Sequence, residues 1–346
     1  MKIGIVGAAG FPGCELIRLL AAHPGGLSLE VITSRASAGT RISDISPNLV
    51  GYCDLELEPT DIETLRGRVD TVVLAVPHRV AQEYVPALLD GGFRVVDFSA
   101  DFRLHDPDTY EKWYATEHVA RETLPLAVYG LPERYRADIP GARLVANPGC
   151  YPTSAILGAL PLVAEGLVDP MSLVIDAKTG MSGASRTPSE SSHLVSRHEN
   201  ITAYNIGKHR HTPEIEQELG AVTASDVMVS FTPHLMPMTR GILSTIYGSL
   251  TGKLTTDEAR AVYQARYDDE PFVHVLGAGR PAETKAVLGS NNVHIGVEVD
   301  ERVGRVVVTC AIDNLCKGAA GAVVQNLNLM AGLAETSGLA FPGLMP

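Results

Sequence analysis

The chain has 346 residues, of which 45% are hydrophobic and 20% are charged. This composition excludes a disordered or fibrous protein, and the length predicts two domains. Asp and Glu outnumber Lys and Arg by 40 to 28, which gives a net charge of −12, and no run of basic residues occurs. Nucleic acid and anionic membranes are therefore poor candidate partners.

The N-terminus and the cysteines both predict a soluble, cytoplasmic protein. MKIGIVGAAG runs from one lysine into an apolar stretch that glycines interrupt at once, which is not the pattern of a signal peptide. No stretch reaches the ~18 apolar residues that a membrane helix needs. The cysteines are scattered without a CxxC pair, so we expect free thiols and neither disulfides nor a zinc site. They are Cys14, Cys53, Cys150, Cys310 and Cys316.

The N-terminal part of the chain alternates short apolar runs with amphipathic helical stretches. Strands are predicted at 2–6, 29–33, 70–76 and 93–99, and helices at 12–22 and 79–89. Strands that alternate with helices form a parallel sheet, and strands that are apolar almost throughout are covered on both faces. We therefore predict a Rossmann-like, doubly wound α/β domain over residues 1–150, a fold that commonly binds a dinucleotide.

The pattern changes in residues 151–316, where longer β-rich runs replace the alternation. These runs lie at 172–179, 226–233, 241–250, 293–299 and 304–312. The last two are joined by the short turn DERVG, which indicates an antiparallel hairpin. We predict a second, catalytic and dimerisation domain of α+β type with a mostly antiparallel sheet. Residues 317–346 have helical spacing and are expected to return to the first domain and complete it.

A glycine-rich loop, Gly7-x-x-Gly10-x-x-Gly13, lies between the first predicted strand and the first predicted helix. Glycines there permit a tight turn and let a phosphate approach the backbone N–H groups of the helix N-terminus. The spacing differs from the commoner GxGxxG. The alternative is a glycine-rich turn that binds nothing.

The end of the second predicted strand indicates which nucleotide this loop would bind. A domain that binds NAD carries a carboxylate for the ribose at that place. Here Thr33, Ser34 and Arg35 stand instead. A hydroxyl and a guanidinium suit a 2′-phosphate, so the sequence favours NADP. The alternative is that Arg35 is an ordinary exposed loop residue.

The string NPGCYPT places Cys150 between a short strand and a helix. Backbone N–H groups and the positive end of the helix dipole lie at such a position, so we expect a lowered thiol pKa and a nucleophilic thiolate. A buried structural cysteine is the common alternative, and it describes most of the other four. Cys316, near a strand end, is the one serious rival.

A nucleophilic thiol usually works with a base, and the string KHRHTPE at 208–214 holds two histidines. Thr212 is expected to cap a helix that Pro213 begins, which puts His211 just outside a helix N-terminus, where imidazole stays neutral and accepts a proton. Spacing alone does not decide between His209 and His211. No cysteine or HExxH partner accompanies the pair, so we predict no metal.

Polar residues also gather on three predicted turns, at 97–103, 178–186 and 313–321. Arg103, Lys178 and Arg186 could bind the phosphate or carboxylate of a small acidic substrate. The alternative is that each is a surface charge.

The order of these motifs resembles that of the N-acetyl-gamma-glutamyl-phosphate reductases of arginine biosynthesis, in the aspartate-semialdehyde dehydrogenase-like superfamily. The strings that carry the resemblance run nearly end to end: GAAGFPG, TSRASAG, AVPH, DFSADFR, YGLPE, ANPGCYPT, KTGMSGA, KHRHTPEI, FTPHLMPM and IDNLCKGAAGA. Aspartate-semialdehyde dehydrogenases share the architecture and the cysteine, but YGLPE and HRHTPEI resemble the glutamyl-phosphate branch.

The resemblance implies NADPH-dependent reduction of N-acetyl-L-glutamyl 5-phosphate to the 5-semialdehyde, with Cys150 as nucleophile and His211 as acid/base. It implies contacts to NADP from Gly7, Ala9, Gly10, Phe11, Gly13, Ser34, Arg35, Pro77, Ser182, Gly183 and Asn314. It implies contacts to the substrate from Arg103, Asn147, Lys178, His209 and Glu214.

Other functions remain open on the sequence alone. A reductase of aspartyl phosphate or of carrier-bound aminoadipyl phosphate would carry the same cysteine chemistry. A cysteine hydrolase or acyltransferase would leave the glycine loop and Arg35 unexplained, and a dinucleotide-sensing module would leave Cys150 and His211 unexplained. We expect a homodimer or homotetramer, because the apolar strands of the second domain could pack against another subunit.

Overall fold

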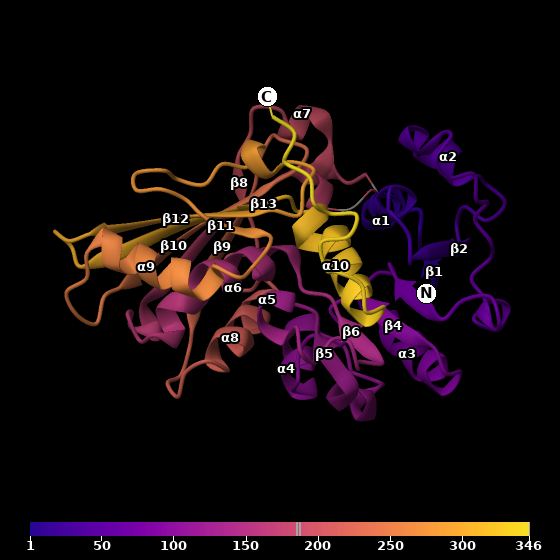
Figure 1. Ribbon diagram of the computed structural model, residues 1–346, viewed down its shortest axis with the longest axis horizontal. Helices are drawn as coiled ribbons and strands as arrows, with labels where there is room; N and C mark the ends of the chain where they lie inside the picture. The colour runs from indigo at the N-terminus through magenta and orange to yellow at the C-terminus, as the bar shows by residue number, and fades with distance from the viewer. Residues whose placement is uncertain (185, 187, 346) are drawn as a thin grey trace. The chain divides into compact units, whose positions relative to one another are not determined.

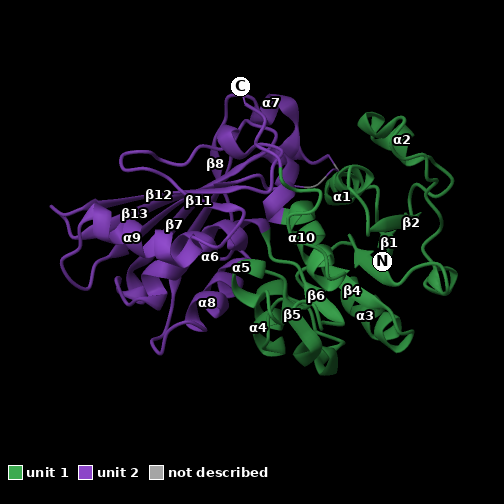
Figure 2. Ribbon diagram, viewed as in Figure 1, with its two compact units in different colours: residues 1–149, 319–340 green, residues 150–318, 341–346 purple. Residues whose placement is uncertain are grey.

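The computed structural model describes residues 1–184, 186 and 188–345, and it divides into two compact units (Figures 1 and 2). Unit 1 comprises residues 1–149 and 319–340, and unit 2 comprises residues 150–318 and 341–346. The chain therefore passes from unit 1 into unit 2 at Cys150 and goes back to unit 1 after Gly318. Its last residues, from Phe341 on, belong to unit 2 again.

Unit 1, all of whose residues are described, is built on a parallel sheet with the strand order β2-β1-β3-β4-β6-β5 (Figure 1). The strands are β1 (Lys2–Val6), β2 (Ser28–Thr33), β3 (Thr71–Leu74), β4 (Arg94–Asp97), β5 (Ala127–Tyr129) and β6 (Leu144–Ala146). Every residue of β3 and β6 is buried, as expected of strands covered on both faces. The predicted doubly wound parallel sheet is confirmed. Its order changes direction between β1 and β3, whose carboxyl ends form the place where such sheets bind ligands.

The helices of unit 1 connect these strands. They are α1 (Phe11–Ala21), α2 (Ile42–Ile45), α3 (Ala81–Asp90), α4 (Pro107–Tyr114), α5 (Pro132–Tyr135) and α10 (Gly321–Met330), with 3-10 turns at Pro47–Leu49, Glu63–Leu65 and Arg121–Leu126. α1 buries its apolar side, which includes Leu16, Ile17 and Leu20. α10 lies beside α1 although it comes from the other end of the chain (Figure 1).

The C-terminal helix is shorter than the predicted span of 317–346. α10 ends at Met330 because Gly332 takes a left-handed conformation with φ +69°. The N–H groups of Gly332 and Leu333 then fold back onto the last carbonyls of the helix, which is the Schellman arrangement. Residues 331–345 form no helix or strand.

The described part of unit 2 is built on a second sheet with the order β11-β12-β13-β10-β7-β9-β8. The strands are β7 (Leu173–Thr179), β8 (Thr202–Ala203), β9 (Val229–Leu235), β10 (Ile242–Ser249), β11 (Val273–Val275), β12 (Val293–Asp300) and β13 (Arg305–Ile312). β12 and β13 form the predicted antiparallel hairpin. Only β7 with β9 and β11 with β12 pair in parallel among these described strands, so the expected mostly antiparallel sheet is confirmed.

The described part of unit 2 has the helices α6 (Cys150–Ala164), α7 (Leu194–Arg197), α8 (Thr212–Gly220) and α9 (Thr256–Tyr267), with 3-10 turns at Pro170–Ser172, Met181–Ala184, Glu190–Ser192 and Lys285–Val287 and a π-helical turn at Cys316–Ala320. α6 lies against β10 and β13, α9 against β12, and α8 against α6 and β9 (Figure 1). β10 shows the consequence: its residues alternate between buried and half-buried.

α6 is the central helix of unit 2, and residues 151–163 are all buried. A Cβ on Gly158 would come within 2.5 Å of the Ile246 side chain, so the glycine lets α6 approach β10 closely. Pro161 lies inside the helix and cannot donate to the carbonyl of Leu157. The Tyr267 hydroxyl donates to that carbonyl instead, over 2.6 Å. The close approach at Gly158 and the bond from Tyr267 therefore anchor α6, whose first residue is Cys150, within unit 2.

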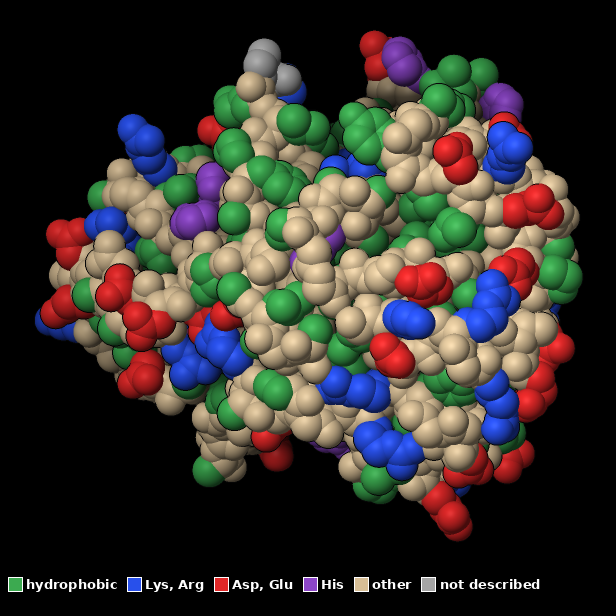
Figure 3. Space-filling view, turned by 45° about the vertical axis from the view of Figure 1, so that its right-hand side comes forward, with side chains coloured by type: hydrophobic (Ala, Val, Ile, Leu, Met, Phe, Trp, Pro, Cys, Tyr) green, Lys and Arg blue, Asp and Glu red, His purple; other side chains and the backbone are tan. Residues whose placement is uncertain are grey.

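Acidic and basic side chains are interspersed on the face of the molecule shown in Figure 3. No helix among the described residues is long and apolar enough to cross a bilayer.

Candidate active site

Cys150, the predicted nucleophile, is the first residue of α6 and is half-buried. The first turn of α6 holds no acidic residue. Its N–H groups and the positive end of its dipole therefore favour an anionic sulfur at this position. A Cβ on Gly318 would lie 2.9 Å from the Cβ of Cys150, so only glycine allows the π-helical turn to approach the thiol this closely.

Five rings form an aromatic cluster next to this helix start: Tyr151, Tyr204, His209, His211 and Phe231. The His209 ring is central. Its centroid lies 5.3 Å from that of Phe231, 5.5 Å from Tyr204, 5.6 Å from Tyr151 and 4.8 Å from His211. Because Tyr151 is the second residue of α6, the cluster ties both histidines to the element that carries the thiol.

Burial decides the protonation states in the aromatic cluster. It raises the pKa of Tyr151 and that of Tyr204, the latter to about 12, and a negative charge on Cys150 adds to the rise in both. Burial lowers the pKa of His209 to about 4, and the positive charge of Arg210 lowers it further. At neutral pH the two phenols are therefore protonated and the His209 imidazole is uncharged.

The sequence predicted Thr212 as the cap of this helix and His211 just outside it, but the structure has His211 itself as the N-cap of α8. The helix already begins at Thr212, and no side chain caps it. The His211 backbone N–H donates to Nδ1 of His209 over 3.2 Å, and its carbonyl accepts from the Ile215 N–H. His211 thus stands at the N-terminus of α8, whose first turn also holds Glu214.

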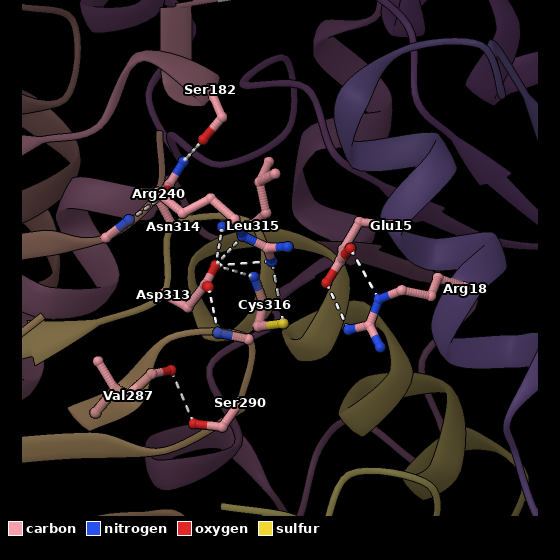
Figure 4. A network of polar contacts seen from close by, with 12 residues as sticks. Glu15, Arg18, Ser182, Arg240, Val287, Ser290, Asp313, Asn314, Leu315 and Cys316 are labelled. Carbon is pink, nitrogen blue, oxygen red and sulfur yellow. Dashed lines mark hydrogen bonds and ion pairs between the residues drawn. The ribbon is translucent and has the colours of Figure 1, made fainter. Parts of the chain in front are cut away.

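A buried carboxylate organises the turn after β13 (Figure 4). Asp313 is fully buried, and its Oδ1 accepts from Nε and Nη2 of Arg240 at 3.2 and 3.0 Å. The same carboxylate accepts the backbone N–H groups of Leu315, Cys316 and Gly289. Sequence reasoning placed Asp313 in the polar turn at 313–321 but gave it no role, and it missed Arg240. The available signal was a charged residue directly after the apolar string VVVTCAI.

Asn314 is held inside this turn. Its Oδ1 accepts the Gly241 N–H at 2.7 Å, and its Nδ2 donates to the Ser182 hydroxyl at 2.9 Å (Figure 4). A Cβ on Gly183 would lie 3.7 Å from the same Nδ2. The structure therefore brings together three residues for which the resemblance implies cofactor contacts: Ser182, Gly183 and Asn314.

Cys316, the rival nucleophile, belongs to the same turn. It is 1% exposed, and its Sγ accepts from Nη2 of Arg240 at 3.4 Å. Both thiols begin a helical segment, but the N–H groups at Cys316 already have a carboxylate, that of Asp313, as their acceptor. Cys150 is the more accessible of the two, and the first turn of its helix holds no acidic residue.

The other predicted substrate residues of unit 2 lie apart from one another. Lys178 forms an ion pair with Asp176 over 3.0 Å, and both stand on the face of β7 opposite to Thr179, whose hydroxyl bonds Tyr151. Glu214 is 1% exposed in the first turn of α8. The remaining turn residue proposed from the sequence, Arg186, is exposed.

In unit 1, the first and third glycines of the loop are required by close backbone contacts. Gly7 has φ +86°, and a Cβ there would lie 2.5 Å from the carbonyl oxygen of Ala75. A Cβ on Gly13 would lie 2.5 Å from the carbonyl oxygen of Ala8. These contacts bend the chain sharply between β1 and α1 and would leave no room for any other residue.

The second glycine is different. Gly10 is the N-cap of α1, no side chain caps this helix, and no acidic residue lies in its first turn. A Cβ on Gly10 would meet nothing closer than 3.8 Å, so the space above the helix end is open. Ala9 and Phe11 flank it and are half-buried. An uncapped helix end beside open space fits a phosphate group of a dinucleotide.

The end of β2 holds Ser34 and Arg35. Arg35 is exposed; its Nη2 donates to the Tyr84 hydroxyl, and its Cζ lies 5.7 Å from the centre of that ring. Ser34 is buried, and its hydroxyl accepts the N–H of Ser37. Pro77 follows β3 and is exposed. The ring contact holds the guanidinium at the edge of the sheet where a 2′-phosphate would be bound.

Arg103 is buried rather than open to a ligand. Nε donates to the carbonyl of Asn147 over 2.8 Å and Nη2 to the carbonyl of Phe98 over 2.7 Å. Asn147 is 1% exposed and donates its N–H to the carbonyl of Asp97. Burial, reinforced by the charge of Asp101, raises the pKa of Asp97 to about 7. Arg103 thus braces the turn that follows β6.

Among residues 1–184, 186 and 188–345, no group of three or more His, Cys, Asp or Glu side chains is placed to hold a metal ion.

Both units match models of known protein families. Residues 2–142 match "Semialdehyde dehydrogenase, NAD binding domain", and residues 150–314 match "Semialdehyde dehydrogenase, dimerisation domain". The fold is also found in solved structures. Aspartate semialdehyde dehydrogenase II from Vibrio cholerae is 16% identical with a TM-score of 0.71, and the match covers 96% of this chain and 98% of that chain. Aspartate semialdehyde dehydrogenase with NADP from Candida albicans is 17% identical with a TM-score of 0.64, over 95% and 98% of the two chains.

Similarity in sequence is much higher to another group of proteins. N-acetyl-gamma-glutamyl-phosphate reductase of Desulforudis audaxviator is 50% identical over 346 residues, which is 100% of both chains. The protein of that name from Moorella thermoacetica is 48% identical, again over 100% of both chains. The chain belongs to the N-acetyl-gamma-glutamyl-phosphate reductase family.

Proposed function

We propose that this chain reduces N-acetyl-L-glutamyl 5-phosphate to N-acetyl-L-glutamate 5-semialdehyde and phosphate, with NADPH, in arginine biosynthesis. One observation carries the proposal: Cys150 begins α6 beside an aromatic cluster that holds two histidines. The names of full-length relatives at about half identity support the substrate. The solved aspartate semialdehyde dehydrogenases support the fold alone, because their identity is 16–19%.

Cys150 starts the reaction as a thiolate favoured by the N-terminus of α6. Its Sγ attacks the acyl carbon of the substrate, the C–O bond to the phosphate breaks, and a thioester forms on Cys150. Phosphate is a good leaving group, so this step depends mainly on position. Gly318 and the rigid start of α6 fix the place of the sulfur.

His211 is the proton carrier in this proposal. Its neutral imidazole takes the thiol proton of Cys150 and later exchanges a proton with the oxygen of the thiohemiacetal, so that the C–S bond breaks and the aldehyde leaves. Its position supports this role, because the His211 ring lies 6.0 Å from that of Tyr151, the residue next to Cys150 in α6.

The residues of unit 1 fit a dinucleotide. Gly10, with Ala9 and Phe11, would hold its phosphates at the N-terminus of α1, and Arg35 would bind a 2′-phosphate. NADPH, when bound, supplies the hydride that brings the acyl group to the aldehyde level.

The reverse reaction tests the proposal. Enzyme with NADP, phosphate and N-acetylglutamate semialdehyde should show growing absorbance at the reduced-nicotinamide wavelength, and omission of phosphate should suppress it. A signal with aspartate semialdehyde alone would assign the chain to a different substrate. No signal with either aldehyde would contradict a reductase of acyl phosphates.

A homodimer or homotetramer in the cytoplasm is part of the same proposal. The matched description of residues 150–314 as a dimerisation domain supports assembly through unit 2. The face of its sheet opposite to α6, which includes Thr245, Tyr247 and Val307, is half-exposed in one chain. Light scattering of the purified protein reports its mass directly.

A further inference from the structure

The two histidines before α8 differ in surroundings although they are two positions apart. His209 has four aromatic neighbours from four different segments: Tyr151 of α6, Tyr204 after β8, Phe231 of β9 and His211. For His211, the ring contacts are with Tyr151 at 6.0 Å and with His209. The two side chains are both half-buried, so what distinguishes them is that His209 contacts all four of the other rings in the aromatic cluster.

One side-chain and one backbone acceptor of His209 close the turn that leads into α8. Its Nδ1 accepts the N–H of His211 at 3.2 Å, and its carbonyl accepts the N–H of Thr212 at 3.0 Å. A side-chain acceptor for the N–H two residues later, together with a carbonyl that accepts three residues later, is the arrangement that Asx turns use. His209 therefore fixes the φ and ψ angles from which the His211 side chain projects.

We propose that His209 is a positioning residue: enclosed by Tyr151, Tyr204 and Phe231, it holds the His211 backbone through Nδ1 and does not itself exchange protons in the reaction. The proposal rests on the proposed function, which gives His211 the acid/base role. It replaces the substrate contact that the family resemblance implies for His209, and it decides between two histidines that spacing leaves equivalent.

The charged and titratable groups that face His209 agree with this role. Tyr151 and Tyr204 have raised pKa values and stay neutral, and the nearby charge, Arg210, is positive. Burial and then Arg210 lower the pKa of His209 to about 4. The imidazole is therefore uncharged throughout the neutral range, so Nδ1 keeps a lone pair for the His211 N–H. It would lose this acceptor only when the pH falls toward that value.

Two substitutions separate positioning from proton transfer. His209→Asn keeps an acceptor for the His211 N–H, because an Asn side chain makes the same i to i+2 bond, while His209→Leu keeps the bulk and removes the acceptor. We expect kcat within about threefold of the wild type for His209→Asn, and about a ten- to hundredfold lower kcat for His209→Leu with little change in the KM for NADP. Equal kcat values in the two variants would overturn the proposal.

The pH profile gives a second, independent readout. If His209 only positions His211, the limbs of kcat/KM against pH keep their midpoints in His209→Asn. Loss of a limb in that variant would show that His209 itself titrates in the reaction and would overturn the proposal. NMR titration of the His209 ring in the wild type should give a midpoint near about 4. A midpoint near the ordinary value of about 6.5 would contradict an enclosed imidazole.

His211→Gln separates this inference from the proposed function. It should lose nearly all turnover, because glutamine carries no proton. Wild-type rates in His211→Gln would defeat the acid/base role of His211, and with it the proposed mechanism. The comparison of His209→Asn with His209→Leu, by contrast, tests only the hydrogen bond from the His211 N–H to the side chain at position 209.

Discussion

Two helices of this chain begin at the end of a parallel strand of unit 1, and they use the same kind of helix end in opposite ways. α1 follows β1 and has Gly10 at its N-cap, with no side-chain cap and no acidic residue in its first turn. α6 follows β6 and also has no acidic residue in its first turn, but it begins with Cys150. Both ends present N–H groups and a positive dipole to whatever negative charge is near.

The difference lies in where that negative charge comes from. At α1 the glycine leaves open space, so in the function we propose a ligand brings the charge as a phosphate. At α6 the proposed anion is the sulfur of the chain itself, and Gly318 lies close to the Cβ of Cys150. In this proposal the same kind of helix end serves as a binding site in unit 1 and carries a nucleophile in unit 2, depending on a single side chain.

The largest expected effect comes from removal of the anion at α6. Cys150→Ser keeps the shape of the helix start but replaces a thiolate by a hydroxyl that stays protonated, so turnover should fall by about 10⁴-fold or more. NADPH affinity should change by less than about twofold, since the α1 site is untouched. Steady-state rates and fluorescence titration measure the two quantities.

Cys53→Ser is the matched control, because Cys53 is also half-buried but lies in a loop. It should leave both quantities unchanged. Turnover within tenfold of the wild type in Cys150→Ser would mean that another thiol is the nucleophile, and Cys316 would be the first to test.

Much of this arrangement could be predicted from local sequence. Strands that are apolar almost throughout predicted the parallel sheet, and a glycine before Cys150 with a proline soon after predicted a helix start at the thiol. β5 was missed because its three residues, Ala127–Tyr129, are too few to show a period. The C-terminal helix was predicted too long because the glycine at 332 ends it through a left-handed turn.

The site itself depends on contacts that local sequence cannot show. His209 and His211 are equivalent by spacing, and the difference arises from Tyr204 and Phe231, which reach the cluster from other elements. Arg240 and Asp313 are 73 positions apart, and neither has a partner suggested by its neighbours. Burial of a polar group is a property of the folded chain, so it cannot be assigned before the packing is known.

The intermediate effect comes from placing an anion at α1, which makes that helix end resemble α6. Gly10→Asp adds a side chain where a Cβ has room, and Asp at an N-cap accepts a backbone N–H. We expect a gain of about 0.3–1 kcal/mol in the free energy of unfolding, together with a loss of NADPH affinity of about a hundredfold, because the carboxylate occupies and repels the phosphate position.

Gly10→Ala is its control, since alanine adds volume but neither charge nor an acceptor. Urea unfolding and NADPH titration on both variants separate the two contributions. If Gly10→Asp binds NADPH as tightly as the wild type, the open end of α1 is not the phosphate site. The proposed contrast between α1 as a binding site and α6 as the carrier of a nucleophile would then be wrong for α1.

The smallest expected effect concerns how unit 1 distinguishes two nucleotides that share the same phosphates at α1. Arg35→Glu places a carboxylate at the end of β2, where the guanidinium now lies on the Tyr84 ring. NADPH should lose about ten- to thirtyfold in affinity through loss of a charge-assisted bond, and NADH should change little. Arg302→Glu makes the same charge change on the exposed β12–β13 hairpin and should leave both affinities as they are. An equal loss for NADPH and NADH in Arg35→Glu would mean that Arg35 contacts a part of the dinucleotide that both share. Arg35 would then not bind the 2′-phosphate, and the end of β2 would not distinguish the two nucleotides.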